Sequence, residues 1–320
     1  MPSSFPSLDL SKLKTYSIER RSHKSAVGLF ASVPRPSKEI VKLVEGLPQI
    51  LKGEEWRKLI PLWLSAKRKK KTRLVMAGAH VLKCGLSPVL IDLAEQGFIS
   101  TLALHGAGGI HDLEIAFFGQ TSEEVADTLE EGKFGMVKET AELFAAAVYL
   151  AARRNIGLGE AFGEYIEKTK APYRKYSLLY NFYRLRLPAT IHVAFGTDTV
   201  HQHPNFPAGE TGEGTWKDFK VLASAVGGLH NGGIVANLGS AVILPEVFLK
   251  TLAVARNISS PVKNFTASNF DMIQHYRPSQ NVLLRPTLKS GQAFAFTGHH
   301  EIMLPLLAAS LKSYERFKRK

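Results

Sequence analysis

The chain has 320 residues, of which 45% are hydrophobic and 22% are charged, a composition typical of a globular protein with a large core. Its formal net charge is +13, and it contains one cysteine. A single cysteine excludes an intramolecular disulfide and a four-cysteine zinc site, and it favours a reducing cytoplasm. The basic runs lie at the termini and between elements without interleaved aromatic residues, which makes nucleic acid an unlikely partner.

The first part of the chain differs in pattern from the rest. Residues 1–71 are expected to form an irregular arm, two helices at about 38–51 and 56–65, and a basic linker. Residues 72–320 are expected to form a single domain. No uninterrupted apolar run reaches the ~18 residues that a membrane helix needs, and residues 1–21 lack the apolar stretch of a secretory signal.

From residue 72 onward, short apolar runs alternate with helical patterns. Runs such as TRLVMAG are typical of strands that are buried on both faces. The alternation predicts an α/β fold, a Rossmann-like, doubly wound, mainly parallel sheet with helices on both faces. Strands are expected at 72–78, 99–109, 189–196, 232–240 and 292–298, and helices at 87–97, 137–154, 216–229, 245–257 and 301–317, with a capping box, TSEE at 121–124, opening a further helix.

Polar or glycine-rich loops follow the predicted strands. Ligands of an open parallel sheet bind beyond the carboxyl ends of the strands. Glycines there let the backbone approach a phosphate, although no complete G-x-G-x-x-G fingerprint is present. The loops are GAHVLKCG (78–85), HGAGGIHDLE (105–114), GTDTVHQHP (196–204), NLGSAVILP (237–245), SNFDMIQHYRP (268–278) and TGHHE (297–301). Together they predict a ligand site at one edge of the sheet.

Histidines are concentrated in these loops. In an extended loop His201 and His203 would share a face and could reach one metal ion, with Glu301 or the pair His111 and Asp112 as further ligands. No H-E-x-x-H spacing is present, so we favour a histidine-lined pocket for a polar substrate. A serine hydrolase and a Walker-type ATPase are unsupported, because G-x-S-x-G and Walker A sequences are both missing.

The order and spacing of the loops resemble the deoxyhypusine synthase family. The unit from GAHVLKCG to HGAGGIHDLE resembles the strands and loops of that family's NAD-binding domain. Thr197 and Asp198 match its Thr-Asp pair, 238–240 match part of its LGGG loop, and 269–271 resemble its Glu-Phe-Asp segment. An Arg-Pro pair follows at 277–278, and the resemblance covers about 74–311.

The sequence also departs from that family. The lysine that forms the imine with the aminobutyl group has about Pro286 at its matching position, and proline has no amine. Lys289 lies three residues further on. The acidic residues that follow the family's glycines become His111 and Asp112, which weakens recognition of a polyamine cation. The resemblance therefore implies the fold, a homotetramer with sites near subunit interfaces, and an NAD site, but not the standard deoxyhypusine reaction.

We therefore predict an NAD-dependent enzyme that acts on a small polar substrate, such as an amine. Three alternatives stay open: aminobutyl transfer from spermidine through Lys289, a metal-dependent hydrolase, and a non-enzymatic binding protein on an enzyme fold. The predicted catalytic residues are Asp198, His111, His201, His203 and His299. The predicted NAD-binding residues are Gly78, His80, Gly108, Gly109, Asp112, Thr197, Gly239, Ser240 and Asp271, and no residue is assigned to a metal.

Overall fold

A six-stranded sheet forms the centre of the computed structural model, which describes residues 5–258 and 261–318. Its strands lie in the spatial order β5-β3-β2-β6-β7-β8, and every neighbouring pair is parallel. Counted along the chain, this is the order 3-2-1-4-5-6 of the Rossmann fold, so the predicted fold class is confirmed. The strands are β2 (Arg73–Ala77), β3 (Thr101–His105), β5 (Ala189–His192), β6 (Ile234–Leu238), β7 (Thr266–Asp271) and β8 (Gln292–Thr297).

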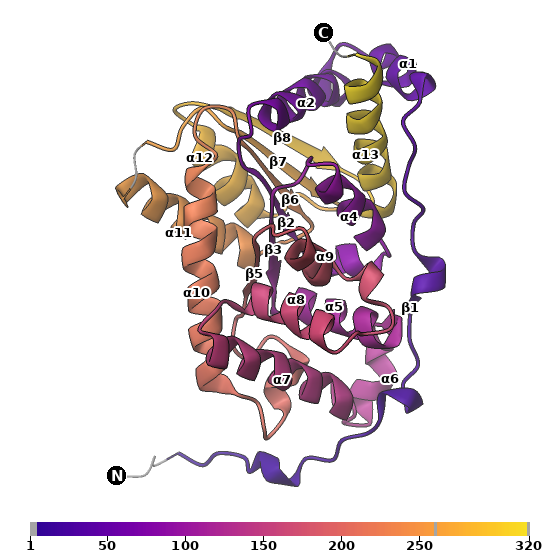
Figure 1. Cartoon of the computed structure of the whole chain (residues 1–320), viewed down its shortest axis with the longest axis vertical. Coiled ribbons are helices and arrows are strands. Elements are labelled where there is room, and N and C mark those ends of the chain that lie inside the picture. The colour runs from indigo at the N-terminus through magenta and orange to yellow at the C-terminus, as the bar shows by residue number, and fades with distance from the viewer. Residues whose placement is uncertain (1–4, 259–260, 319–320) are drawn as a thin grey trace.

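Helices cover both faces of the sheet (Figure 1). The α-helices are α1 (Lys38–Gly46), α2 (Leu51–Arg68), α3 (Ala79–Lys83), α4 (Ser87–Glu95), α5 (Gly106–Phe118), α6 (Val125–Glu130), α7 (Lys138–Arg154), α8 (Leu158–Lys168), α9 (Leu178–Arg184), α10 (Ala208–Gly227), α11 (Ile243–Ile258), α12 (Arg285–Thr287) and α13 (His300–Phe317). Short 3-10 helices include η2 (Ile18–Arg20) and η5 (Thr199–Gln202), and η6 (Pro278–Leu284) is a π-helix. Helices α10 and α11 pack on one face, and α4, α5, α9 and α13 on the other.

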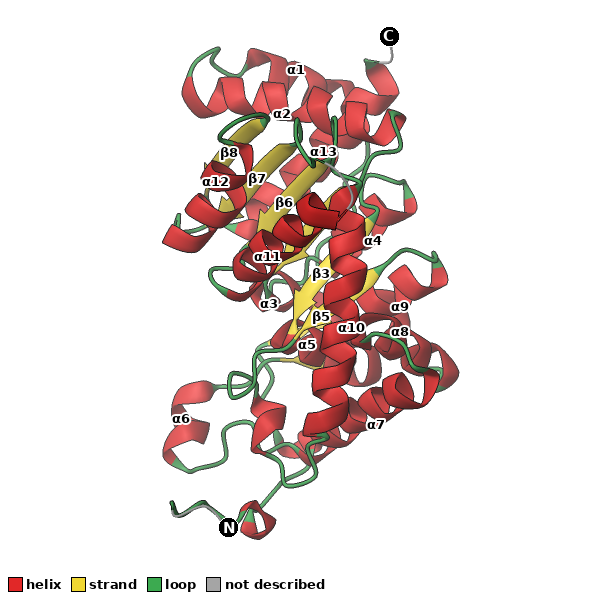
Figure 2. Ribbon diagram, turned by 90° about the vertical axis from the view of Figure 1, so that its left-hand side faces the viewer, coloured by secondary structure: helices red, strands yellow, loops and turns green. Residues whose placement is uncertain are grey.

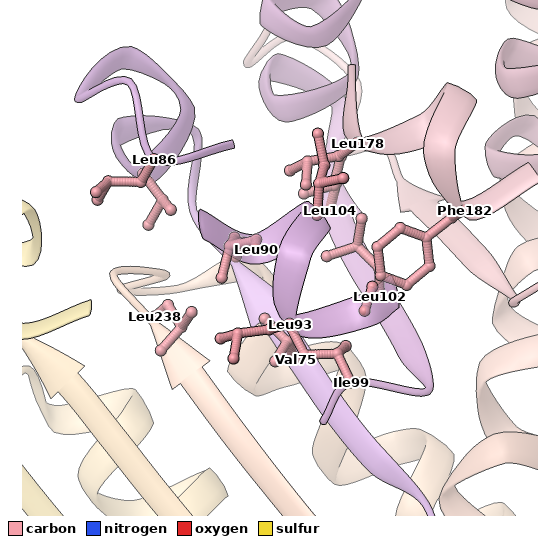
Figure 3. Packing of buried hydrophobic residues seen from close by; sticks show 14 of the residues in the cluster. Val75, Leu86, Leu90, Leu93, Ile99, Leu102, Leu104, Leu178, Phe182 and Leu238 are labelled. Atoms are coloured by element: carbon pink, nitrogen blue, oxygen red, sulfur yellow. The ribbon is translucent and has the colours of Figure 1, made fainter. Parts of the chain in front are cut away.

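Alternating side chains of the central strands join two separate apolar clusters. In β2, Leu74 and Met76 pack toward α10 and α11, whereas Val75 packs toward the opposite helices, as the two-residue period of a strand requires. Leu90 and Leu93 of α4 lie against that second face (Figure 3). Each such fully buried aliphatic side chain contributes roughly 2 kcal/mol, so the sheet is fixed between two apolar layers.

The N-terminal helices share the core of the sheet. Trp56 and Trp63 of α2 belong to the larger apolar cluster, and the indole N–H of Trp63 donates to the carbonyl of Phe98 at 2.8 Å. Helices α1 and α2 lie at one end of the molecule and the N-terminal arm lies with α7 at the other (Figure 2). The proposed boundary between 1–71 and 72–320 stays a prediction. Among the described residues, no helix is long and apolar enough to cross a membrane.

Several predicted helix bounds are wrong for local reasons. The expected helix at 38–51 ends at Gly46, because Pro48 restricts the residue before it to extended backbone. The next helix, α2, begins at Leu51 and continues to Arg68, into the run expected to be a basic linker. The helix expected from residue 216 begins at Ala208 instead.

Two predicted motifs at 105–124 also form differently. The GAGG stretch was expected to be a turn, but α5 begins at Gly106, so these residues form its first helical turn. The TSEE stretch is not a capping box. The hydroxyl of Thr121 donates to Glu114 at 2.6 Å instead of capping a helix, and Glu124 precedes α6 without a side-chain cap. Two short strands, β1 (Ser25–Ala26) and β4 (Gln120–Thr121), pair there antiparallel.

Candidate functional site

The carboxyl ends of the six strands form one edge of the sheet, which we name the carboxyl edge. The final residues of neighbouring strands pair there, His105 with His192 and Asp271 with Thr297. The chain order reverses direction between β2 and β6, the central pair of strands. This switch point is where ligands bind in Rossmann-like sheets.

Two glycines meet at the switch point. A β-carbon on Gly78 would overlap the carbonyl oxygen of Gly239, so only glycine fits this backbone approach. Gly239 has a φ of +68°, a left-handed conformation that glycine adopts without steric cost. The imidazole of His300 covers Gly239 from α13, and its Nε2 donates to the carbonyl of Phe270 at 3.1 Å.

Buried polar atoms without a protein partner gather at the carboxyl edge. They include Oδ2 of Asp271, Oδ1 of Asn237, Nδ1 of His105 and Nδ1 of His300. Native structures leave few such atoms unpaired, and a bound ligand or water is a common explanation. The amide of Asn237 is held by its Nδ2, which donates to Asn269 and to the carbonyl of Ser240. Its Oδ1 is therefore fixed in position and has no protein partner.

Asp198 and His201 form a second polar group, beyond β5. The Nδ1 of His201 accepts hydrogen bonds from the backbone N–H groups of Gly196 and Asp198, both at 3.1 Å. The ring proton of the neutral imidazole therefore lies on Nε2, which is 4.0 Å from Oδ2 of Asp198. Neither of these two atoms has another partner. The pair is built as a proton donor facing a carboxylate across a short gap.

Burial changes the ionisation of this pair. It raises the pKa of Asp198 to about 6, although the backbone N–H of Ala107 at the start of α5 acts in the opposite direction. Burial also lowers the pKa of His201. A carboxyl group that titrates near neutral pH beside a neutral imidazole is suited to proton transfer.

A cavity of about 200 Å³ brings several predicted residues together. We name it the Asp198 cavity. Its lining includes Asp198, Thr197 and His111, together with Lys83 and Arg21, neither of which the sequence analysis had selected. It lies over the first turn of α5, where Ala107 also contributes to the wall.

Other predicted catalytic histidines lie apart from this cavity. Residues 199–202 form a 3-10 helix, so His201 and His203 do not share a face. The Nε2 of His203 donates to the carbonyl of Gly135 at 3.0 Å. The side chain of His299 is 64% exposed. Among residues 5–258 and 261–318, no group of three or more His, Cys, Asp or Glu could hold a metal ion, which leaves the hydrolase alternative without a ligand set there.

Some predicted cofactor-binding residues have structural contacts. Both carboxylate oxygens of Asp112 accept hydrogen bonds at the start of α9, from Ser177 and from two backbone N–H groups. A β-carbon on Gly108 would contact Leu104 at 3.2 Å, and one on Gly109 would contact Ile191 at 3.0 Å, so these glycines let α5 pack closely on the sheet.

His80 and Ser240 lie near the switch point. The Nε2 of His80 is 3.2 Å from the Cys84 thiol, and its ring packs edge-on against His300. Burial raises the pKa of the Cys84 thiol to about 11, which keeps it protonated. The Ser240 hydroxyl accepts a hydrogen bond from the N–H of Leu244 in the first turn of α11.

Lys289 lies at the other edge of the sheet. It precedes Gln292, the first residue of β8, and its side chain is exposed. A strand of six residues separates that position from Thr297 at the carboxyl edge, which is roughly 20 Å at the rise of a β-strand. Pro286 is buried in α12. Within one chain Lys289 therefore lies away from Asp198, and aminobutyl transfer through Lys289 stays an untested alternative.

Comparison with solved structures finds several distant likenesses. The chain is similar to AgrE in its ternary complex with ornithine and NAD+, with a TM-score of 0.52 and 14% identity over 89% of this chain and 35% of AgrE. A putative LOR/SDH protein from Methanococcus maripaludis S2 gives a TM-score of 0.48 and 15% identity over 92% of this chain and 73% of that protein. A putative deoxyhypusine synthase from Entamoeba histolytica gives 0.48 and 12% over 81% and 87%.

The likeness to AgrE shows a shared fold and nothing finer. The match covers 35% of the length of AgrE, about a third of that protein. Comparison with protein-family models gives no match, and comparison with curated proteins gives none either.

The contact at the switch point predicts the effect of a single methyl group. Gly78→Ala should destabilise the protein by about 3 kcal/mol, because the methyl overlaps the backbone of Gly239 and either loop must move. The matched control is Gly227→Ala in α10, where a β-carbon meets no atom within 4 Å and should stabilise by about 0.5 kcal/mol. Urea unfolding measures both, and equal stability of the two variants would contradict the contact.

Burial of Asp198 predicts a pH-dependent stability. Its pKa of about 6 lies above the 3.8 of an exposed aspartate, so the favourable contribution of the protonated form is present below pH 4 and is lost as pH rises through 6. Relative to Asp198→Asn, which keeps a capping oxygen but does not titrate, the wild-type protein should lose about 2–3 kcal/mol between pH 4 and 7. If the difference in unfolding free energy between the two proteins does not change with pH, the raised pKa of Asp198 is refuted.

Proposed function

We propose that the chain is an NAD-dependent enzyme that acts on a small polar substrate carrying an amine, and that its site is the carboxyl edge. The observation that carries this proposal is the coincidence of two features. The switch point of a 3-2-1-4-5-6 sheet is closed by the glycine pair Gly78 and Gly239, and buried polar atoms without partners surround it.

The residues at the switch point fit a dinucleotide. Oδ2 of Asp271 and Oδ1 of Asn237 are acceptors without partners, and they suit the hydroxyl groups of a ribose. Gly78 and Gly239 let the loops after β2 and β6 approach each other closely at the switch point, where the pyrophosphate of a dinucleotide binds in Rossmann-like sheets. When bound, NAD would supply the acceptor for a hydride, while this chain would bind and orient it.

The Asp198 cavity provides the groups for proton transfer. Asp198 titrates near pH 6, so it is able to accept a proton from an ammonium group and to hold it at Oδ2. The Nε2–H of His201 then faces whichever charge develops on that carboxylate. Glu114, Glu123, Arg21 and Lys83 also line the cavity. Because Arg21 is paired with Glu114, Asp198 and Glu123 remain against the single cation of Lys83, and this balance favours a cationic amine over a neutral substrate.

The similarity to AgrE supports the same class of ligand. AgrE is solved with NAD+ and with ornithine, an amine. A homotetramer with sites near subunit interfaces is part of the proposal and rests on the resemblance to the deoxyhypusine synthase family; light scattering of the purified chain tests it. A non-enzymatic binding protein is another alternative, and the titratable pair Asp198 and His201 favours an enzyme over it.

Calorimetric titration with NAD+ and NADH tests the cofactor. We expect saturable binding to the wild-type chain and about tenfold weaker binding to Asp271→Asn, because one hydrogen bond to a charged acceptor is worth about 1.5 kcal/mol. Lys289→Met, altered at the opposite edge, should bind as the wild type does.

Two further results would contradict the proposal. If neither form of the cofactor binds, the NAD site does not exist. If borohydride traps spermidine-derived label on a peptide containing Lys289, the chain is an aminobutyl transferase after all.

A further inference from the structure

A chain of hydrogen bonds connects the N-terminal arm to the Asp198 cavity. Arg21, which follows η2, forms two bonds of 2.8 Å to the carboxylate of Glu114 in α5. The hydroxyl of Thr121 in β4 donates to Oε2 of the same carboxylate at 2.6 Å. Nδ1 of His111 lies 2.6 Å from that hydroxyl. The hydroxyl of Thr140 donates to the other oxygen, Oε1, at 2.7 Å.

The charge of Glu114 decides which groups donate and which accept in this series of hydrogen bonds. Burial alone would raise the pKa of Glu114, but the hydrogen bonds and the charge of Arg21 outweigh it, and the net shift is downward. An ionised carboxylate only accepts hydrogen bonds. The single proton of the Thr121 hydroxyl must therefore point to Glu114, and that hydroxyl must accept from His111. Nδ1 of His111 then carries the ring proton, and Nε2 carries a lone pair.

We propose that Arg21 is a positioning residue, which acts through Glu114 and Thr121 to hold His111 in the tautomer whose Nε2 accepts a proton. His111 lines the same cavity as Asp198. This inference rests on the proposed function, in which the cavity removes protons from an amine. It adds a second proton acceptor and gives the N-terminal arm a part in the site.

The tautomer matters because His111 is neutral. Burial lowers its pKa to about 4; among the charged and titratable groups that act on it, Glu114 raises the pKa, and Lys83, Arg21 and His105 lower it. At neutral pH the ring therefore has one proton, and the position of that proton decides whether Nε2 donates or accepts.

The N-terminal arm contacts both parts of this hydrogen-bonded network, the Glu114 carboxylate and the Thr121 hydroxyl. Strand β1 pairs with β4, with Ser25 opposite Thr121, so the backbone of the arm fixes the strand that carries the relaying hydroxyl. The N–H of Ile18 donates to Glu139 at 2.8 Å, which anchors the arm on α7 before Arg21. The arm thus holds the Glu114 carboxylate through the Arg21 side chain and the Thr121 hydroxyl through the backbone of β1.

Loss of Arg21 would reverse the direction of the hydrogen bonds between Glu114, Thr121 and His111. A buried carboxylate without its cation takes up a proton, and the protonated Glu114 can donate to Thr121. The hydroxyl would then donate to Nδ1 of His111, and the ring proton would move to Nε2. The same imidazole would face the cavity as a donor.

Two threonine variants isolate the relay. Thr121→Val and Thr140→Val each remove one hydroxyl from Glu114, but only the first removes the partner of His111. We expect the nitrogen-15 NMR shifts of His111 to report a single Nδ1–H tautomer in the wild type and in Thr140→Val, and a mixture in Thr121→Val. A wild-type ring protonated at Nε2, or a Thr121→Val spectrum equal to that of the wild type, overturns the inference.

Arg21→Met tests the cation itself, with Arg20→Met as its control, because Arg20 is exposed next to it. Arg21→Met should lose the Nδ1–H tautomer and Arg20→Met should keep it; retention in Arg21→Met contradicts the role of the cation. If Arg21→Met does not fold, the threonine pair decides. The spectra need neither cofactor nor turnover, so a failure to bind NAD would refute the proposed function without changing this result. Where turnover is measured, Thr121→Val should reduce it by about 10²-fold.

Discussion

The shared direction of the six strands is the constraint on which the rest of this structure depends. Because every neighbouring pair is parallel, all six carboxyl ends lie at one edge, and the helices that connect the strands must cover both faces. The faces are filled by apolar clusters. Polar side chains can therefore gather in numbers at the edges, and the close approach of Gly78 and Gly239 brings the two central loops together there.

Four buried carboxylates of this protein separate into two kinds. Glu114 and Asp112 are fully buried, but both oxygens of each accept hydrogen bonds, from Arg21 and two threonines in one case and from the start of α9 in the other. A buried charge is tolerated when it is satisfied in this way. Asp198 and Asp271 each keep one buried oxygen without a partner. Both of these lie at the carboxyl edge, so incomplete satisfaction marks the site more clearly than burial does.

The sequence predicted the fold from its alternation of apolar runs and helical patterns. It placed a ligand site at the carboxyl edge, which stays a prediction. It also selected Gly78, Gly239 and Asp198, because each follows a strand. It could not predict what Asp112 contacts, since its partners begin 65 residues later, at Ser177. The separation of His201 from His203 depends on a single 3-10 turn, and no periodic pattern encodes so short an element. Asn237 was quoted only as the first residue of a loop, because the sequence does not show that it lies in a buried strand with one side-chain oxygen unpaired.

The arm joins the site through contacts between residues far apart in the chain. Arg21 and Glu114 are 93 residues apart, and Ile18 and Glu139 are 121 apart. Such contacts carry a large loop-closure entropy and form after local structure. The arm has no strand of its own in the six-stranded sheet; it is held by the β1–β4 pair and by Val27 and Phe30, which pack on the larger apolar cluster. Detachment of the arm would separate Arg21 from Glu114 and Ser25 from Thr121 at the same time. In the relay that we propose, the tautomer of His111 is therefore coupled to the attachment of the arm, and a ligand that prefers the accepting form of Nε2 also favours the attached arm.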